Sequence, residues 1–135
     1  MAYRIYLVDD DRFLLDLYAV KFKNAGHEVN VFGGGEELLA ALRKGSADAP
    51  DAILLDVIMP GVGGFEALEA IRKEGLAKGA KIIILSNQGQ DSDIEKAKQL
   101  SVDGYIVKAS AIPSEVLAET LRTIESGPSG PGTPG

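Results

Sequence analysis

The chain has 135 residues, of which 45% are hydrophobic and 25% charged, which is typical of one folded domain with its own core. Its formal net charge of −6 argues against nucleic-acid binding, because no cationic surplus exists to displace counterions from phosphates. The absence of cysteine excludes disulfides and thiolate metal sites. No apolar run approaches the roughly 18 residues of a membrane span. Acids follow the N-terminus too soon for a signal peptide, so we expect a cytoplasmic protein without a membrane partner.

Short apolar runs alternate along the chain with longer stretches of helical periodicity. Five runs rich in Ile, Val, Leu and Tyr predict strands, which in chain order are 3–8, 28–32, 52–55, 81–85 and 104–107. Several of these runs are apolar throughout, which is typical of parallel strands that are buried on both faces.

Apolar residues spaced three and four apart predict five helices between and after these strands. The first covers 12–25 and ends before Gly26, the third closes at Gly75, and Pro113 lies near the first turn of the fifth. The residues that carry the pattern, helix by helix, are Phe13, Leu14, Leu17, Tyr18 and Phe22; Leu38, Leu39 and Leu42; Ala67, Leu68 and Ile71; Ile94, Ala97 and Leu100; Val116, Leu117, Leu121 and Ile124.

Strands that alternate with helices indicate an α/β fold with helices on both faces of a parallel sheet. Right-handed crossovers leave few topologies, and the common five-strand solution is the doubly wound, flavodoxin-like order 2-1-3-4-5. We expect this domain to cover 1–125. Residues 126–135, SGPSGPGTPG, have the composition of a disordered tail or linker.

Polar residues follow the apolar runs at one end of each predicted strand. They are Asp9, Asp10 and Asp11 after the first strand, Asp56 after the third, Ser86 and Asn87 after the fourth, and Lys108 after the fifth. The carboxyl ends of parallel strands share one edge of the sheet, where ligands bind at the point at which strand order reverses. Strands one and three are neighbours there, so Asp9, Asp10 and Asp56 should meet beside Ser86 and Lys108.

Crowded carboxylates repel, so a cation is needed to keep them ionised. An all-oxygen ligand set favours a hard ion, and Mg²⁺ above others. A carboxylate beside Mg²⁺ and a lysine is a plausible nucleophile for phosphoryl transfer through an aspartyl-phosphate. Mg²⁺, Lys108 and Ser86 would each take one phosphoryl oxygen.

Simpler interpretations exist for several of these residues. Asp11 fits a helix N-cap, Asp56 alone could form a turn before MPGVGG, and Tyr105 alone fits a packed strand aromatic. His27, the only histidine, follows Gly26 at the opposite, amino edge of the sheet, and we expect it on the surface. The run Gly33–Gly35 is too short and misplaced for a dinucleotide-binding loop.

Four segments together resemble the receiver domain of bacterial two-component response regulators. They are LVDDD (7–11), LLDVIMPGVGGFE (54–66), IIILSN (82–87) and DGYIVK (103–108). The resemblance extends from residue 3 to about 125. It implies a signalling domain that catalyses its own phosphorylation and dephosphorylation rather than a turnover enzyme.

The resemblance also assigns roles to individual residues. Asp56 would be the phosphoacceptor, assisted by Lys108 and Ser86. Asp10 and Asp56 would ligate Mg²⁺ directly, Asp9 would act through water, and the backbone carbonyl of Ile58 would complete the protein ligands. Tyr105 occupies the aromatic switch position, whose ring turns inward when the Ser86 hydroxyl moves to the phosphoryl group.

The resemblance implies partners as well. A phosphohistidine on a sensor histidine kinase or phosphotransfer protein would be the donor, and the surface of helix 4, strand 5 and helix 5 would signal to an output partner or downstream domain. A phosphorylation-dependent homodimer is compatible with the family. The chain departs from the usual pattern at some positions, which bear on switching and partner choice: Gly63, Asn87, Ser101, Val102 and Ala109, the last in place of a cis proline.

Two other functions compete with the receiver. Asp9 and Asp11 have the Asp-x-Asp spacing of haloacid-dehalogenase-type phosphatases, although Phe13 stands where those proteins have Thr or Val and no cap insertion is present. The other is a pseudo-receiver, which would bind partners without phosphorylation.

Overall fold

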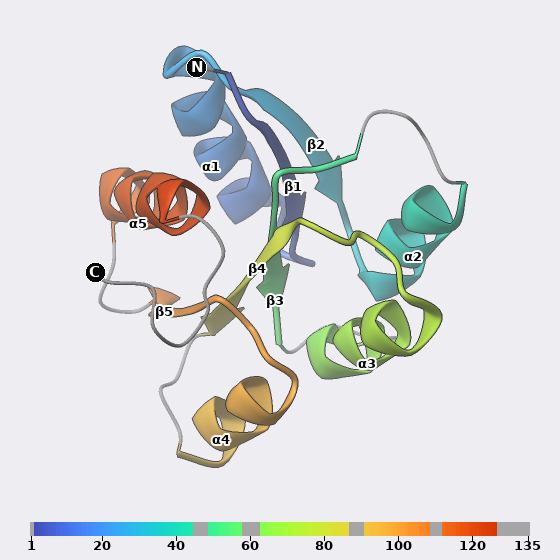
Figure 1. Cartoon of the computed structure of the whole chain (residues 1–135). Helices are drawn as coiled ribbons and strands as arrows, with labels where there is room; N and C mark the ends of the chain where they lie inside the picture. Colours follow the sequence, from blue (N-terminus) through green and yellow to red (C-terminus); the bar gives the residue numbers. More distant parts are fainter. Residues whose placement is uncertain (1, 45–48, 58–62, 87–90, 109–111, 127–135) are drawn as a thin grey trace.

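The computed structural model describes residues 2–44, 49–57, 63–86, 91–108 and 112–126. Strands and helices alternate through these ranges as the sequence predicts (Figure 1). The elements in chain order are β1 (Arg4–Val8), α1 (Arg12–Asn24), β2 (Glu28–Phe32), α2 (Gly35–Arg43), β3 (Ala52–Asp56), α3 (Gly64–Glu74), β4 (Lys81–Ser86), α4 (Asp91–Gln99), β5 (Gly104–Val107) and α5 (Pro113–Glu125).

The strands form one parallel sheet in the order β2-β1-β3-β4-β5, so the predicted doubly wound fold is confirmed. Strand order reverses between β1 and β3, where Val8 pairs with Leu55. The sequence placed Asp56 and Ser86 just past their strands. Both are instead the last residue of the strand, because the ladder continues to Asp56↔Leu85 and Ser86↔Val107.

Helices cover both faces of the sheet, and the sheet divides the core into two layers. Alternate residues of one strand point to opposite faces, so Ile5 and Leu7 pack under α1 and α5 while Tyr6 and Val8 pack under α2, α3 and α4. Figure 1 shows α1 and α5 on one side of the strands and α2 and α3 on the other. Full burial of each large aliphatic side chain stabilises the fold by about 1.5–3 kcal/mol.

The helix ends match the sequence signals. The Asp11 carboxylate accepts a hydrogen bond from the Leu14 N–H (3.2 Å) and caps α1, as expected. Gly26 (φ +94°) and Gly75 (φ +68°) adopt the left-handed conformation after α1 and α3. Pro113 is the first residue of α5.

The prediction that His27 lies on the surface is wrong. It does lie at the amino edge of the sheet, just before β2, but the residue is only 8% exposed. Its Nδ1 accepts a hydrogen bond from the Tyr3 N–H at 3.1 Å, and its ring stacks on the Tyr3 ring at 5.5 Å. Burial is tolerated because the imidazole is both packed and hydrogen-bonded, which the flanking sequence did not reveal.

Two apolar residues of α1 that mark its periodicity face solvent. Phe13 is 72% exposed and Leu17 41%, while the inward face consists of Leu15, Tyr18, Ala19 and Phe22. None of the described helices is both long and apolar enough to cross a membrane. The predicted tail lies almost entirely outside the described residues, as do Ile58, Asn87 and Ala109.

Candidate functional site

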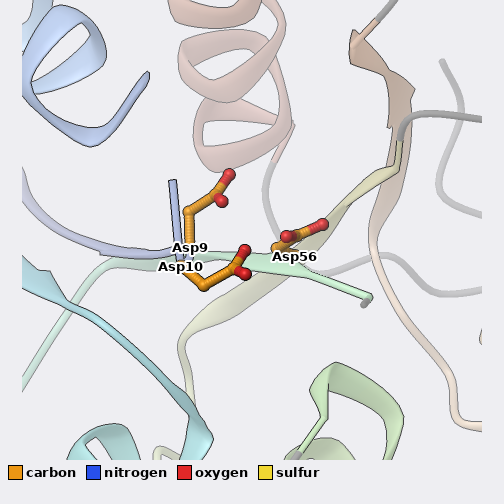
Figure 2. Close-up of side chains that lie close together, drawn as sticks. All are labelled: Asp9, Asp10 and Asp56. Carbon is orange, nitrogen blue, oxygen red and sulfur yellow. The ribbon is translucent and has the colours of Figure 1, made fainter. Parts of the chain in front are cut away.

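Three carboxylates meet at the carboxyl edge of the sheet. Asp9 and Asp10 follow β1, Asp56 ends the adjacent β3, and one carboxylate oxygen from each lies within 4.8 Å of the others. Figure 2 shows the Asp10 carboxylate directed toward Asp56, with Asp9 beside them. The convergence that the strand order predicted is therefore present.

The three acids differ in exposure. Asp9 is 2% exposed and Asp56 5%, whereas Asp10 faces solvent. Asp9 is held in place because its Oδ1 accepts a hydrogen bond from the Asp11 N–H at 2.9 Å, while its own N–H continues the ladder to Phe32. The site thus has a fixed, buried wall and one carboxylate open to solution.

Lys108 supplies a buried positive charge to this cluster. It follows β5, its side chain is 5% exposed, and its Nζ donates to Asp9 Oδ2 at 2.9 Å and lies 3.4 Å from Asp56 Oδ1. A buried ammonium is costly unless an anion partners it. Lys108 has two such partners, Asp9 and Asp56.

Burial and charge shift the pKa values of both partners. Burial, followed by the neighbouring Asp9 charge, raises the pKa of Asp56 to about 6, against the opposing effect of Lys108. For Lys108, burial lowers the pKa, but the hydrogen bond to Asp9 and the Asp56 and Asp9 charges outweigh it, so the pKa is raised. Near neutral pH, Asp56 is therefore mostly a carboxylate, and Lys108 is an ammonium.

Ser86 and Tyr105 lie on the strands beside Asp56. Ser86 ends β4, is 3% exposed, and comes one residue after Leu85, the residue that pairs with Asp56. Tyr105 lies on β5, partly buried against the core under α2, α3 and α4. The hydroxyl is thus at the same sheet edge as the acids, while the tyrosine is nearer the start of its strand.

Asp11 does not join the cluster. Its carboxylate caps α1 and lies outside the group of Asp9, Asp10 and Asp56. A haloacid-dehalogenase-type phosphatase would need both Asp9 and Asp11 in the site, and here only Asp9 is in it. Among the described residues, the three acids that lie together are Asp9, Asp10 and Asp56, which are the ones that the receiver resemblance assigns to the site.

Gly64 positions the site and was missed by the sequence reasoning. Its N–H donates to the Val57 carbonyl at 3.0 Å, and a Cβ at this position would lie 2.0 Å from the Asp56 carbonyl oxygen. Only glycine lets α3 begin this close to the end of β3. The Gly63-Gly64 pair at a helix start was the available signal, but sequence alone does not show which backbone it contacts.

The C-terminal end of α4 is anchored to α3. Arg72 of α3 donates to the Leu100 carbonyl at 3.1 Å and to the Ser101 carbonyl at 2.9 Å. Ser101, which follows α4, adopts the left-handed conformation with φ +59°. A serine there is strained relative to glycine, and the Arg72 contacts help to hold this turn.

The donor set suits a hard divalent cation. All three acids offer oxygen, which is what Mg²⁺ takes from proteins. With every group ionised, three carboxylates and one ammonium leave two negative charges, which one divalent ion would balance. The residues present therefore fit Mg²⁺.

The chain belongs to the response regulator receiver domain family, whose sequence pattern matches residues 5–121. The DNA-binding response regulator MtrA of Mycobacterium tuberculosis is 30% identical over 118 residues, which are 87% of this chain and 49% of MtrA. The regulatory protein VanRc of Enterococcus gallinarum is 32% identical over 87% of this chain and 48% of its own. The chain thus spans about half the length of these curated relatives.

Solved structures give the same family and fold. The chemotaxis protein CheY4 of Vibrio cholerae superposes with a TM-score of 0.81 at 27% identity, covering 91% of this chain and 99% of CheY4. The response regulator TrrA of Thermotoga maritima, solved with Mg²⁺ and BeF, gives 0.74 at 30% identity, covering 92% and 99%. The family predicted from the four sequence segments is confirmed.

Proposed function

We propose that this receiver domain accepts a phosphoryl group on Asp56 and uses it as a signal. The observation that carries the proposal is the placement of Asp56. It is a buried carboxylate within 4.8 Å of two other acids and 3.4 Å from the Lys108 ammonium, at the sheet edge where strand order reverses. An ionised oxygen beside fixed positive charge is suited to attack phosphorus and to tolerate the charge that develops there.

The proposed step transfers a phosphoryl group from a phosphohistidine of a sensor histidine kinase or phosphotransfer protein. An Asp56 Oδ attacks phosphorus, a P–O bond forms, the P–N bond breaks, and its electron pair stays on the imidazole, which takes up a proton. Lys108 stabilises one phosphoryl oxygen by its charge, and the Ser86 hydroxyl donates to another. Attack of water on phosphorus later releases phosphate and restores Asp56, so the chain acts on itself rather than turning over a substrate.

Asp10 and Asp56 would ligate Mg²⁺ directly, and Asp9 would reach it through water. The carbonyl of Ile58, which lies outside the described residues, would complete the set. Bound Mg²⁺ would neutralise charge on the phosphoryl oxygens. The exposure of Asp10 supports this division, because it leaves one carboxylate open to a hydrated ion, while Asp9 is already engaged by Lys108 and the Asp11 N–H.

The proposed output is a change in the surface formed by α4, β5 and α5. Ser86 would move toward the phosphoryl group and Tyr105 would turn inward after it, which alters the face that a partner meets. MtrA is a DNA-binding response regulator and this chain matches about half of it, so we extend the proposal to an output partner or an attached output domain, with 126–135 as linker.

Phosphorylation in vitro tests the proposal. The chain is incubated with Mg²⁺ and a small acyl phosphate, and intact-mass spectrometry should show the gain of one phosphoryl group. Asp56→Asn should abolish the gain, since an amide is not a nucleophile here. Asp11→Asn is the matched control, because it replaces a neighbouring acid outside the cluster with another good N-cap residue. Labelling that survives Asp56→Asn would refute the assignment, and an unlabelled wild-type chain would favour the pseudo-receiver.

A further inference from the structure

Helix α1 carries a second apolar face that the fold leaves uncovered. Phe13, Leu17 and Val20 are 72%, 41% and 56% exposed, although large apolar side chains are the ones that a domain usually buries. They line a groove of about 600 Å³ whose far wall is Pro113 and Ser114 at the start of α5. Contiguous apolar surface of this kind marks an interaction site.

The spacing of this face is that of a short coiled coil. Phe13, Leu17, Val20 and Asn24 are separated by four, three and four residues, so they take heptad positions d, a, d and a. The residues of α1 that pack into the domain's own core take the b, c and f positions, which lie on the opposite side of the helix: Leu15, Tyr18, Ala19 and Phe22. The helix thus has one seam for its own domain and another that is free to pair.

The polar residues beside the seam are self-complementary. Asp16 takes position g and Lys21 position e, and both are exposed in the groove. In a parallel pair of helices, position g of one faces position e of the next heptad on the other, five residues on. Asp16 of one copy would then face Lys21 of the second copy, and the two-fold axis repeats the contact.

Asn24 supplies an independent indication of the same arrangement. It is exposed at the last residue of α1 and occupies position a, where a single polar asparagine specifies register and a two-stranded state. In a parallel pair the two copies of Asn24 meet and their amides can hydrogen-bond. In an antiparallel pair, Asn24 would lie beside Phe13 and leave its amide without that partner.

We propose that the domain self-associates through a parallel pairing of α1 with α1 of a second copy. The pairing is isologous, since the same seam is used on both sides. It does not depend on phosphorylation of Asp56. The seam spans only two heptads, so the dimer is weak and concentration-dependent. Because α1 begins at the carboxyl edge of the sheet, the pairing would turn the acid clusters of both copies to the same end of the dimer.

Sedimentation equilibrium of the unphosphorylated full chain tests the proposal. The average mass should rise with concentration from 14.2 kDa toward twice that value. Leu17→Lys should weaken the association about tenfold or more, because it puts a charge into the apolar seam. Val31→Thr, at a 37% exposed apolar residue of β2, is the control and should not change it. A chain that stays monomeric, or a dimer that survives Leu17→Lys, would overturn the proposal.

Charge reversal separates self-association from binding of a different partner. Asp16→Lys and Lys21→Asp should each weaken the dimer, because like charges then face each other across the pair. The double variant, and an equal mixture of the two single variants, should recover it. If neither the double variant nor the mixture recovers the dimer, the pairing is contradicted. The pairing is also contradicted if the wild type and Leu17→Lys are both monomeric and Leu17→Lys slows phosphorylation from a protein donor but not from a small one. The apolar seam of α1 would then bind that donor.

The orientation is tested with one engineered cysteine in a chain that has none. Asn24→Cys should form a disulfide-linked dimer readily under mild oxidation, because the two copies are adjacent in a parallel pair. In an antiparallel pair they would lie about 16 Å apart at a rise of about 1.5 Å per residue. Cross-linking no faster than for Lys23→Cys, an exposed neighbour off the seam, would contradict the parallel arrangement.

Discussion

The charged side chains at the two edges of the sheet differ in burial and in how they are paired. At the carboxyl edge, Lys108 is shared between Asp9 and Asp56 in a buried cluster that keeps an excess of negative charge. At the amino edge, Arg4 pairs with Glu28 at 2.7 Å in an exposed contact. The Arg4–Glu28 pair is balanced and stabilises the fold modestly, whereas the cluster at the carboxyl edge keeps a negative charge that a bound cation would balance.

Of the substitutions that test this comparison, Gly64→Ala at the carboxyl edge should change the free energy of unfolding most. The added Cβ would lie 2.0 Å from the Asp56 carbonyl oxygen, so α3 or the end of β3 must shift. We expect a loss of about 4 kcal/mol in the free energy of unfolding, measured by chemical denaturation. Gly34→Ala is the control, because nothing lies within 4 Å of its added Cβ. Equal effects of the two substitutions would show that Gly64 does not lie this close to the Asp56 carbonyl in solution.

Lys108→Met should be the next most damaging change. Within the described part of the chain, it removes the ammonium that pairs with Asp9 and Asp56 and leaves these two buried carboxylates facing each other. We expect a loss of about 3 kcal/mol at neutral pH. The loss should shrink toward pH 5, where Asp56 can take up a proton. A loss that does not depend on pH would point to packing of the lysine stem instead.

Asp56→Asn should stabilise the fold. The pKa of Asp56 is raised from 3.8 to about 6, so between these values the folded chain holds more protons than the unfolded chain. The free energy of unfolding therefore falls as the pH rises through this window, and the cost is complete above pH 6. The asparagine variant should be more stable at pH 7 by about 2 kcal/mol, with a flatter pH profile. An unstable variant with the wild-type profile would contradict the shift.

Glu28→Gln should have the smallest effect and completes the comparison. Its partner Arg4 is near the surface, and the glutamate side chain is 65% exposed. We expect a loss below about 1 kcal/mol that disappears at high salt. Thermal denaturation at low and high ionic strength measures this loss. A large loss that does not depend on salt would show that the Arg4–Glu28 pair contributes as much to stability as the buried charges of the site.

Much of the fold and of the candidate site follows from sequence patterns that strand geometry interprets. Apolar runs located the strands, and the order 2-1-3-4-5 brought Asp9, Asp10 and Asp56 together although 46 residues separate Asp10 from Asp56 in the chain. Lys108 could be expected there because a lysine that follows a buried strand needs an anion. These features depend on where strands end, and the ends of the apolar runs show that to within one residue.

Other features depend on contacts that periodicity does not encode. Helix α1 is apolar on two faces, so the pattern did not show that Phe13 and Leu17 would lie outside while Leu15 went inside. The burial of His27 depends on a backbone donor, the Tyr3 N–H, 24 residues away. The role of Gly64 depends on a backbone carbonyl that only the folded chain brings within reach.

The most direct test of the account is the effect of Mg²⁺ on thermal stability. At pH 7 the midpoint of unfolding should rise with Mg²⁺ concentration and saturate, because a ligand that binds only the folded state stabilises it by mass action. Asp10→Asn should remove the rise and Asp11→Asn should keep it. A rise that is equal in both variants, or absent from the wild-type chain, would contradict the claim that Asp9, Asp10 and Asp56 together form a cation site.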